Sequence, residues 1–183
     1  STIRTAVALW FSDGAAAEAT YGPISRWQTS GVTDMSELFK DAASFNEDIG
    51  AWDTSSVTRM NYMFYYTYGW TSHSATSIGD WDVSNVRSMV GMFRASSFNQ
   101  DISGWNVGAV TSMYHMFRFA TSFNQDISDW SVENVLDMSN MFERASSFNR
   151  WIGDWSVESV VSMYQMFYMA SAFDQDLGWC VDD

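Results

Sequence analysis

Residues 105–129 form one unit of a repeat that organises the chain. They read WNVGAVTSMYHMFRFATSFNQDISD, and the same pattern starts again at Trp130. A tryptophan marks each unit at intervals of about 25 residues, a period typical of repeat architectures. A repeat of this length predicts a solenoid, in which each coil buries its apolar side chains against its neighbours. The marking residues are Trp27, Trp52, Trp81, Trp105, Trp130, Trp155 and Trp179.

Residues 1–26 lie outside the repeat, and we expect them to form an N-terminal helical cap. The spacing of Ile3, Val7 and Trp10 places these side chains on one face of a short helix. A second short helix is expected over the alanine-rich stretch that ends before Gly22. The first coil of a solenoid has an apolar face without a neighbour, and an atypical terminal segment is expected to cover it.

Residues 27–183 carry the repeat. In each unit, apolar residues with the spacing of Met113, Met116, Phe117 and Ala120 predict two turns of helix. The following segment, F-N-Q-D-I, is too short for a second helix and predicts a short strand that pairs in parallel with the next coil. We therefore expect about six coils, each a short strand plus a short helix. The coils are expected to start near residues 27, 52, 81, 105, 130 and 155, with a truncated seventh at 179.

The second unit departs from this pattern. It is longer than the others, because an aromatic-rich stretch, YYTYGW, is inserted at residues 65–70. It also lacks the usual Phe-Asn pair of the other units. Two interpretations remain open. The insertion either contributes to a binding surface or folds back over its own weakened coil.

The repeat resembles that of a known group of proteins. The string VTDMSELFKDAASFNEDIGAW at residues 32–52 is similar to the repeat of BspA-like bacterial surface proteins and mycoplasma-type lipoproteins, and the likeness covers roughly residues 27–181. The resemblance implies a leucine-rich-repeat-like α/β fold, a right-handed solenoid with a parallel sheet on one side. It also implies adhesion or protein interaction at an extracellular or cell-surface location, and an organellar or multi-subunit assembly is the alternative. The family offers no catalytic or cofactor-binding residues to carry over.

Composition limits the partners. Twenty-two acidic residues against nine basic residues give a net charge of −13, which repels phosphate backbones and argues against nucleic acid as a partner. No run of residues approaches the roughly 18 apolar residues of a membrane span. Cys180 is the only cysteine, so an internal disulfide framework is excluded.

No group of residues suggests catalysis, a cofactor or a metal. Neither His73 nor His115 shares a local motif with a nucleophile, and the chain contains no phosphate loop, HExxH or CxxC motif. One repeat position carries aspartates, but its column is interrupted. These carboxylates need either backbone N–H donors or a cation, and a calcium row would need a continuous column. The column consists of Asp48, Asp101, Asp126 and Asp176.

Asparagines that follow the core phenylalanine are predicted to form a structural ladder. Stacked coils place their amides one above another, so that each amide can bond the backbone of the neighbouring coil. The column consists of Asn46, Asn99, Asn124, Asn149 and then Asp174.

Aromatic side chains at the variable positions of the repeat predict an interaction face. Equivalent positions in other units are polar or charged, as at Glu37 and Asn140, so these positions are expected to face solvent. Exposed aromatic residues are enriched in interfaces because they bring a large apolar area at little rotamer cost. The expected face comprises Tyr62, Tyr65, Tyr66, Tyr68, Trp70, Tyr114, Phe119, Tyr164 and Tyr168.

These observations favour a non-enzymatic repeat scaffold that binds a protein or a glycan. A structural subunit or spacer, docked in a larger assembly, is the first alternative. A polysaccharide-acting enzyme built on the repeat is the second alternative. Its catalytic carboxylates would have to come together from different coils.

Overall fold

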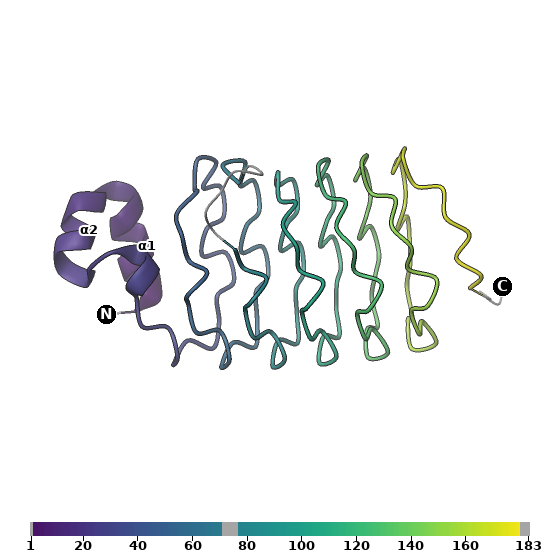
Figure 1. The fold of residues 1–183 in the computed structure, drawn as a ribbon, viewed down its shortest axis with the longest axis horizontal. Helices are drawn as coiled ribbons and strands as arrows, with labels where there is room; N and C mark the ends of the chain where they lie inside the picture. The colour runs from purple at the N-terminus through teal and green to yellow at the C-terminus, as the bar shows by residue number, and fades with distance from the viewer. Residues whose placement is uncertain (1, 71–76, 180–183) are drawn as a thin grey trace.

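The computed structural model describes residues 2–70 and 77–179. It is an elongated stack of coils, with two helices at the N-terminal end and the last coil at the opposite end (Figure 1). Helix α1 spans Ile3–Ser12, helix α2 spans Gly14–Tyr21, and a short 3-10 helix, η1, spans Ile24–Arg26. Of the helices in the described ranges, none is long and apolar enough to cross a membrane.

Helices α1 and α2 form where the sequence predicts them, because both have local capping residues. The hydroxyl of Thr2 accepts the N–H of Thr5 at the start of α1, and the Asp13 carboxylate accepts the N–H of Ala16 at the start of α2. Gly22 ends α2 with a φ of 76°.

The repeat region, as far as the structure describes it, contains no α-helix and no strand of more than a single bridge. The prediction of an α/β, leucine-rich-repeat-like solenoid built from strands and helices is therefore wrong. Successive tight turns replace the predicted helix: the N–H groups of Met116 and Ala120 bond to the C=O groups of Met113 and Phe117. Such turns return every third residue to the same side, so the apolar spacing imitates that of a helix.

Left-handed backbone conformations prevent the helix. His115 and Phe119 have φ values of 60° and 59°. In each of the remaining coils, two residues that are four positions apart in the sequence share this conformation. A residue with positive φ cannot continue a right-handed helix. The other non-glycine residues in this conformation within the repeats are Glu37, Asp41, Tyr62, Tyr66, Ala95, Asn140, Arg144, Gln165 and Met169.

The strand prediction also placed the parallel pairing in the wrong segment. The coils are paired by isolated parallel bridges just before the first methionine of each unit, not in the F-N-x-D-I segment. Each bridge is one residue long, because the left-handed residue three positions later turns the backbone out of the β conformation. The bridged residues are Asp34, Arg59, Ser88, Ser112, Asp137 and Ser162.

A regular backbone ladder nevertheless joins neighbouring coils. In each of the first five coils, the N–H groups of four alternate residues donate to four C=O groups of the next coil, and at least one N–H of the next coil donates back. In the first pair, Met35 donates to Arg59 at 3.0 Å, Asp41 donates to Tyr65 at 2.8 Å, and Thr58 donates back to Thr33 at 2.8 Å. The stack therefore has a direction, with its donor side facing the C-terminal end.

Two columns of aromatic rings fill the core. In the first column, Phe39, Phe64, Phe93, Phe117, Phe142 and Phe167 stack with ring centroids 5.5 to 5.7 Å apart. In the second column, Trp70 takes the place of the phenylalanine that the second unit lacks. Its ring lies 6.4 Å from Phe45 and 5.5 Å from Phe98. Part of the insertion therefore completes the core of its own coil.

The repeated tryptophans tie each coil to the preceding one. The indole N–H of Trp130 donates to the C=O of Ile102 at 3.1 Å, and that of Trp155 donates to Ile127 at 3.1 Å. These tryptophans are also buried, with 3% of each side chain exposed. The same residue thus supplies core area and satisfies a buried carbonyl, which explains its place in every unit.

Candidate interaction face

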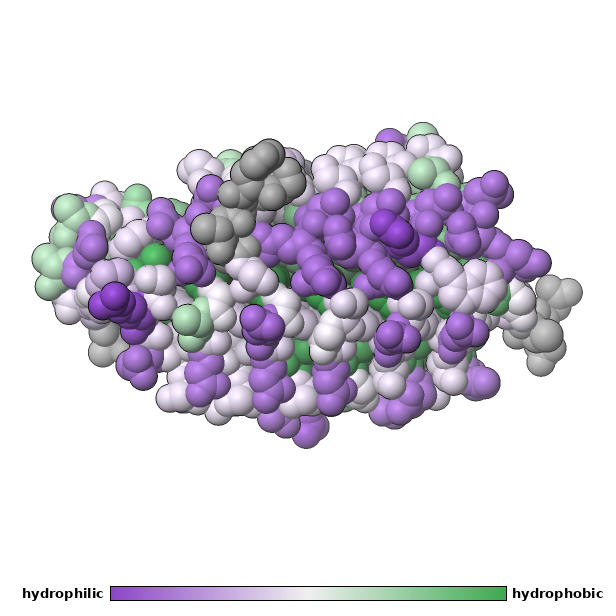
Figure 2. Space-filling view, viewed as in Figure 1, coloured by the Kyte–Doolittle hydropathy of each residue, from purple (hydrophilic) through white to green (hydrophobic). Residues whose placement is uncertain are grey.

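Most residues at the two positions that follow the first-column phenylalanine lie at the surface of the stack, and only Ala95 and Glu143 are buried there. Because the coils are in register, equivalent positions form rows along the long axis, as the hydrophilic rows on one face illustrate (Figure 2). Aromatic and arginine side chains occupy many of these two positions and their immediate neighbours. We call this set the aromatic–arginine stripe, and it consists of Tyr62, Tyr65, Tyr66, Tyr68, Arg94, Arg118, Phe119, Arg144 and Tyr168.

Four tyrosines make up the part of the stripe nearest the N-terminus. Their ring centroids follow one another at 5.9 Å (Tyr62 to Tyr65), 4.2 Å (Tyr65 to Tyr66) and 6.1 Å (Tyr66 to Tyr68). Tyr66 and Tyr68 are 41% and 51% exposed. The guanidinium of Arg94, from the next coil, lies 5.0 Å from the Tyr65 ring centroid. Burial and the neighbouring Tyr66 raise the pKa of Tyr65, although Arg94 acts in the opposite direction.

Phe119 is the centre of a second cluster. The guanidinium groups of Arg118 and Arg144 lie 5.1 Å and 5.4 Å from its ring centroid. Arg118 is held by an ion pair, with its Nε 2.6 Å from Oε2 of the buried Glu143. Asn140 donates from Nδ2 to the same carboxylate oxygen at 2.8 Å. Arg118 is therefore preorganised beside the Phe119 ring, whereas the more exposed Arg144 lies 4.0 Å from the same carboxylate group.

His115 lies buried beside these two clusters. Its ring stacks on Tyr114 with centroids 3.6 Å apart, which brings Tyr114 next to the stripe. Burial, together with the charges of Arg118 and Arg94, lowers the pKa of His115 from its ordinary value of 6.5 to about 4. Its Nδ1 has no hydrogen-bond partner among the described residues. His115 is thus neutral at pH 7, and its buried ring packs beneath Tyr114.

The structure places the predicted face residues in different environments. Tyr164 and Tyr168 are 67% and 49% exposed, and Phe119 is 36% exposed. Trp70 is only 1% exposed, so it belongs to the core and offers no surface to a partner. Tyr62 is half-buried, with its ring against Gly91 of the next coil. The use of the exposed residues for binding stays a prediction.

The arginines of the stripe are the residues that sequence reasoning missed. Arg94 and Arg118 occupy the repeat position of Tyr65, and Arg144 occupies that of Tyr66. Alignment of the units contains this signal, because equivalent positions must lie in one row of the stack. A search restricted to aromatic residues does not detect the arginines at these positions.

The asparagine column forms the predicted ladder. Oδ1 of Asn99 accepts the N–H of Asn124 at 2.8 Å, Oδ1 of Asn124 accepts the N–H of Asn149 at 3.0 Å, and Oδ1 of Asn149 accepts the N–H of Asp174 at 3.0 Å. The ladder therefore fixes the register between coils and is part of the scaffold.

The aspartate column is satisfied by local turns. Asp101 accepts the N–H of Ser103 at 2.9 Å, and Asp126 accepts both the N–H and the hydroxyl of Ser128 at 3.0 and 2.8 Å. These bonds lower the pKa of both carboxyl groups. Among the described residues, no three His, Cys, Asp or Glu side chains are grouped to hold a metal ion.

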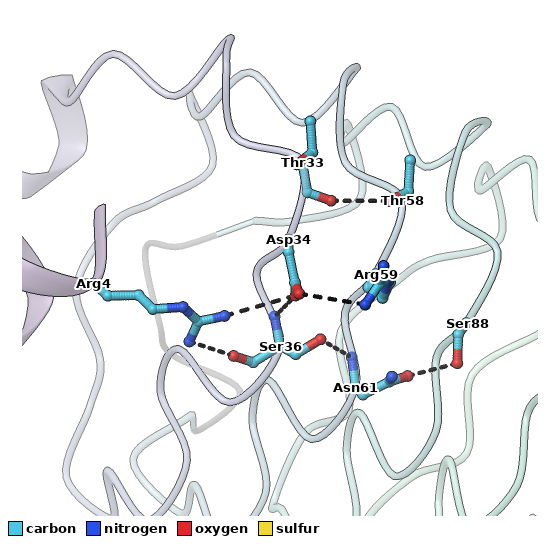
Figure 3. A network of polar contacts seen from close by, with 8 residues as sticks. All are labelled: Arg4, Thr33, Asp34, Ser36, Thr58, Arg59, Asn61 and Ser88. Carbon is cyan, nitrogen blue, oxygen red and sulfur yellow. Dashed lines mark hydrogen bonds and ion pairs between the residues drawn. The ribbon is translucent and has the colours of Figure 1, made fainter. Parts of the chain in front are cut away.

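A polar network joins α1 to the first two coils (Figure 3). Arg4 donates from Nη1 to the C=O of Ser36 at 2.7 Å, and its Nη2 lies 3.6 Å from Asp34, which also faces Arg59 at 3.9 Å. Burial raises the pKa of Asp34, but bonds from Ser36 and the two arginines outweigh it, so the pKa is lowered overall. An adjacent open hollow of about 550 Å³ is lined by residues of both N-terminal helices and the first coil. The network fastens the helices to the stack.

Comparison with known proteins gives one match. The model of a family described as "Mycoplasma protein of unknown function, DUF285" matches residues 14–76 and 67–179. No curated protein and no solved structure matches the chain. The matched residues include nearly all of the repeat region, so the chain belongs to this Mycoplasma protein family.

Proposed function

We propose that the chain is a non-enzymatic repeat scaffold that binds a protein partner through the aromatic–arginine stripe. Tyrosine and arginine are the residues most enriched at the energetic centres of protein interfaces. The observation that carries the proposal is the exposed Phe119 ring with the guanidinium groups of Arg118 and Arg144 over it. Such a ring offers apolar area to a partner, and the fixed guanidinium groups reduce the ordering cost of binding.

The distribution of basic residues also supports the stripe as the binding site. Lys40, Arg94, Arg118 and Arg144 occupy equivalent or adjacent repeat positions, although the chain has only nine basic residues and a net charge of −13. Two acidic residues, Asp41 and Glu143, share these positions with the four basic ones, so the stripe is less acidic than the chain as a whole. A partner with an acidic and aromatic surface would be attracted to the stripe and repelled by other faces.

Two further features support a binding role rather than catalysis. The repeated aspartates already accept N–H groups of their own turns, as Asp101 and Asp126 do. The resemblance of the repeat to BspA-like surface proteins supports surface display and adhesion, and the match to a Mycoplasma family, itself of unknown function, is consistent with it. We therefore propose that the protein acts at the cell surface or outside the cell.

Affinity capture from the source organism tests the proposal. The bait variant carries Tyr66→Asn and Phe119→Asn, because asparagine tolerates the positive φ at both positions. A matched control carries Leu136→Ser and Val161→Ser, two exposed apolar residues outside the stripe. We expect the stripe variant to lose at least about tenfold in affinity for the captured and purified protein, since hot-spot residues contribute at this level.

Three outcomes would contradict the proposal. Equal binding by the native chain and the stripe variant would remove the stripe as the site. Binding to a glycan array that the same substitutions abolish would change the partner class from protein to glycan. An obligate large assembly of the purified chain, measured by analytical ultracentrifugation, would favour a structural subunit.

A further inference from the structure

Trp151 is an exposed aromatic side chain outside the aromatic–arginine stripe. It occupies the repeat position of the aspartate column, where Asp126 precedes it and Asp176 follows it in the neighbouring coils. The residue is 45% exposed, whereas the repeated tryptophans Trp130 and Trp155 are each 3% exposed. Neither the core nor the stripe therefore accounts for this tryptophan.

Local contacts hold the ring of Trp151 in one orientation. Its indole N–H donates to Oδ2 of Asp154 at 3.0 Å. The six-membered part of the ring lies against Gly153, where an added Cβ atom would overlap ring atoms Cζ2 and Cη2. Because the N–H is already bonded and part of the ring meets the backbone, the side chain offers a ligand an apolar surface that needs no further ordering.

The coils on both sides of Trp151 are held in register with it. Two residues earlier, the N–H of Asn149 donates to Oδ1 of Asn124 at 3.0 Å, and Oδ1 of Asn149 accepts the N–H of Asp174 at 3.0 Å. The phenylalanine rings one residue further back in the same three coils stack with centroids 5.9 Å apart. The residues equivalent to Trp151 in the two adjacent coils therefore follow at this short spacing along the stack.

The side chains next to Trp151 have hydrogen-bonding capacity to spare. Oδ1 of Asp126 and Oδ1 of Asp176 each accept the N–H of the residue two positions later, at 3.0 and 3.2 Å. In residues 2–70 and 77–179, neither carboxylate forms a hydrogen bond through its Oδ2. Arg150 donates from Nε to the C=O of Asn124 at 2.7 Å, which leaves both of its Nη groups without a partner among these residues. The exposed ring is thus accompanied by two acceptors and a guanidinium donor.

We propose that Trp151, with Asp126, Arg150 and Asp176 beside it, binds a neutral saccharide. The C–H face of a pyranose ring packs on an aromatic ring, whose face carries partial negative charge. Hydroxyl groups of the sugar donate to the carboxylates and accept from the guanidinium, and such bonds are strong because one partner is charged. Arg150 disfavours a cationic ligand, and the two aspartates disfavour an anionic one. The site uses different repeat positions from the stripe and does not depend on the function proposed for it.

Titration of the full chain with cellohexaose, mannohexaose and chitohexaose tests this inference. The indole N–H signal of Trp151 in NMR spectra reports binding at the site. Trp151→Ser removes the ring and introduces the residue that the second coil carries as Ser77. The matched control, Tyr164→Ser, removes an exposed aromatic residue at a position where Ser139 stands in the preceding coil.

We expect at least one of these hexasaccharides to shift the Trp151 signal. In calorimetric titrations, Trp151→Ser is expected to lose at least about tenfold in affinity, and Tyr164→Ser is expected to bind like the native chain. Asp126→Asn keeps an oxygen acceptor for the local turn, and we expect it to weaken binding severalfold because the charge-assisted bond is lost. Thermal unfolding verifies that each variant is folded.

Four outcomes would overturn the proposal. The first is that no hexasaccharide shifts the Trp151 signal in the millimolar range, and the second is equal affinity of the native chain and Trp151→Ser. The third is tighter binding of a charged probe, either tetramethylammonium or hexagalacturonate. The fourth is loss of saccharide binding in the stripe variant with Tyr66→Asn and Phe119→Asn, which would move the saccharide to the stripe.

Discussion

The ring of Tyr62 lies over Gly91, the residue at the same repeat position in the next coil. A Cβ atom added to Gly91 would overlap the Tyr62 ring, and the backbone of Gly91 has a φ of 57°. Space therefore requires glycine at this position, because the other coils place larger residues such as His115 and Asn140 in the same left-handed conformation. The relationship also fixes the orientation of one member of the stripe.

Gly91→Ala is expected to destabilise the protein by at least about 1–2 kcal/mol, the cost of a left-handed alanine. Displacement of the Tyr62 ring adds to this cost. Ala95 in the same coil has a φ of 52°, so Ala95→Gly is the matched control, and we expect it to change stability by less than about 1 kcal/mol. Urea unfolding of both variants measures the difference. A larger loss from Ala95→Gly than from Gly91→Ala would contradict this account.

Trp70→Ala is expected to cost about 3–5 kcal/mol, because it leaves a gap in the second aromatic column. Trp70→Phe is expected to cost much less, since the other coils carry phenylalanine here. It also loses no hydrogen bond, because the indole N–H of Trp70 has no partner among the described residues. Thermal unfolding of the two variants checks this. Equal losses would show that the indole, not the column, is what the second coil requires.

Asn124→Ala is expected to cost about 0.5–1.5 kcal/mol, the net contribution of the hydrogen bond that its Oδ1 accepts from Asn149. Asn124→Asp keeps an oxygen acceptor at this point and is the control. Chemical denaturation at neutral pH compares the two. If both variants unfolded at the same denaturant concentration as the native chain, the ladder would not be a stabilising feature.

His115 is expected to make stability depend on pH in a defined window. Its pKa in the folded protein is about 4, below the ordinary value of 6.5, so the unfolded chain binds this proton more strongly. The contribution of neutral His115 to the free energy of unfolding is complete above about pH 6.5. It is lost as the pH falls from there toward about 4. Carboxyl groups with lowered pKa, such as Asp101, add losses only near and below their ordinary value of 3.8.

His115→Asn isolates this contribution. Asparagine is present at the same repeat position in the next coil, as Asn140, with the same left-handed backbone. We expect the native chain to lose more stability than the variant between about pH 7.5 and about pH 5, measured by urea unfolding. Identical losses in the two proteins would show that His115 is not the group that titrates.

The core was predictable from the sequence because the repeat marks it. Met113, Phe117 and Trp105 recur at fixed positions, and all three are buried. The asparagine ladder followed from the same logic, since any in-register stack brings Asn99 and Asn124 together. These predictions depend only on which residues stack, not on the local conformation of the chain.

The local conformation was not predictable in this way. Bulky residues such as Tyr62, Phe119 and Arg144 rarely adopt a positive φ, and nothing in their side chains announces it. Hydrogen bonds to both neighbouring coils impose that conformation, so it arises from the stack rather than from local preference. The position of Trp70 was missed for a related reason, because only the empty place in the phenylalanine column explains it. The domain boundary after residue 26 stays a prediction.

The direction of the backbone ladder limits the symmetry of any assembly formed through the ends of the stack. Two chains related by a two-fold axis at their C-terminal ends would bring the N–H of Gln165 and its neighbours against the same donors of the other chain, without acceptors. A head-to-tail polymer is blocked by α1, which Arg4 fastens over the opposite end. The described stack can therefore be extended by a further coil only at the end opposite α1.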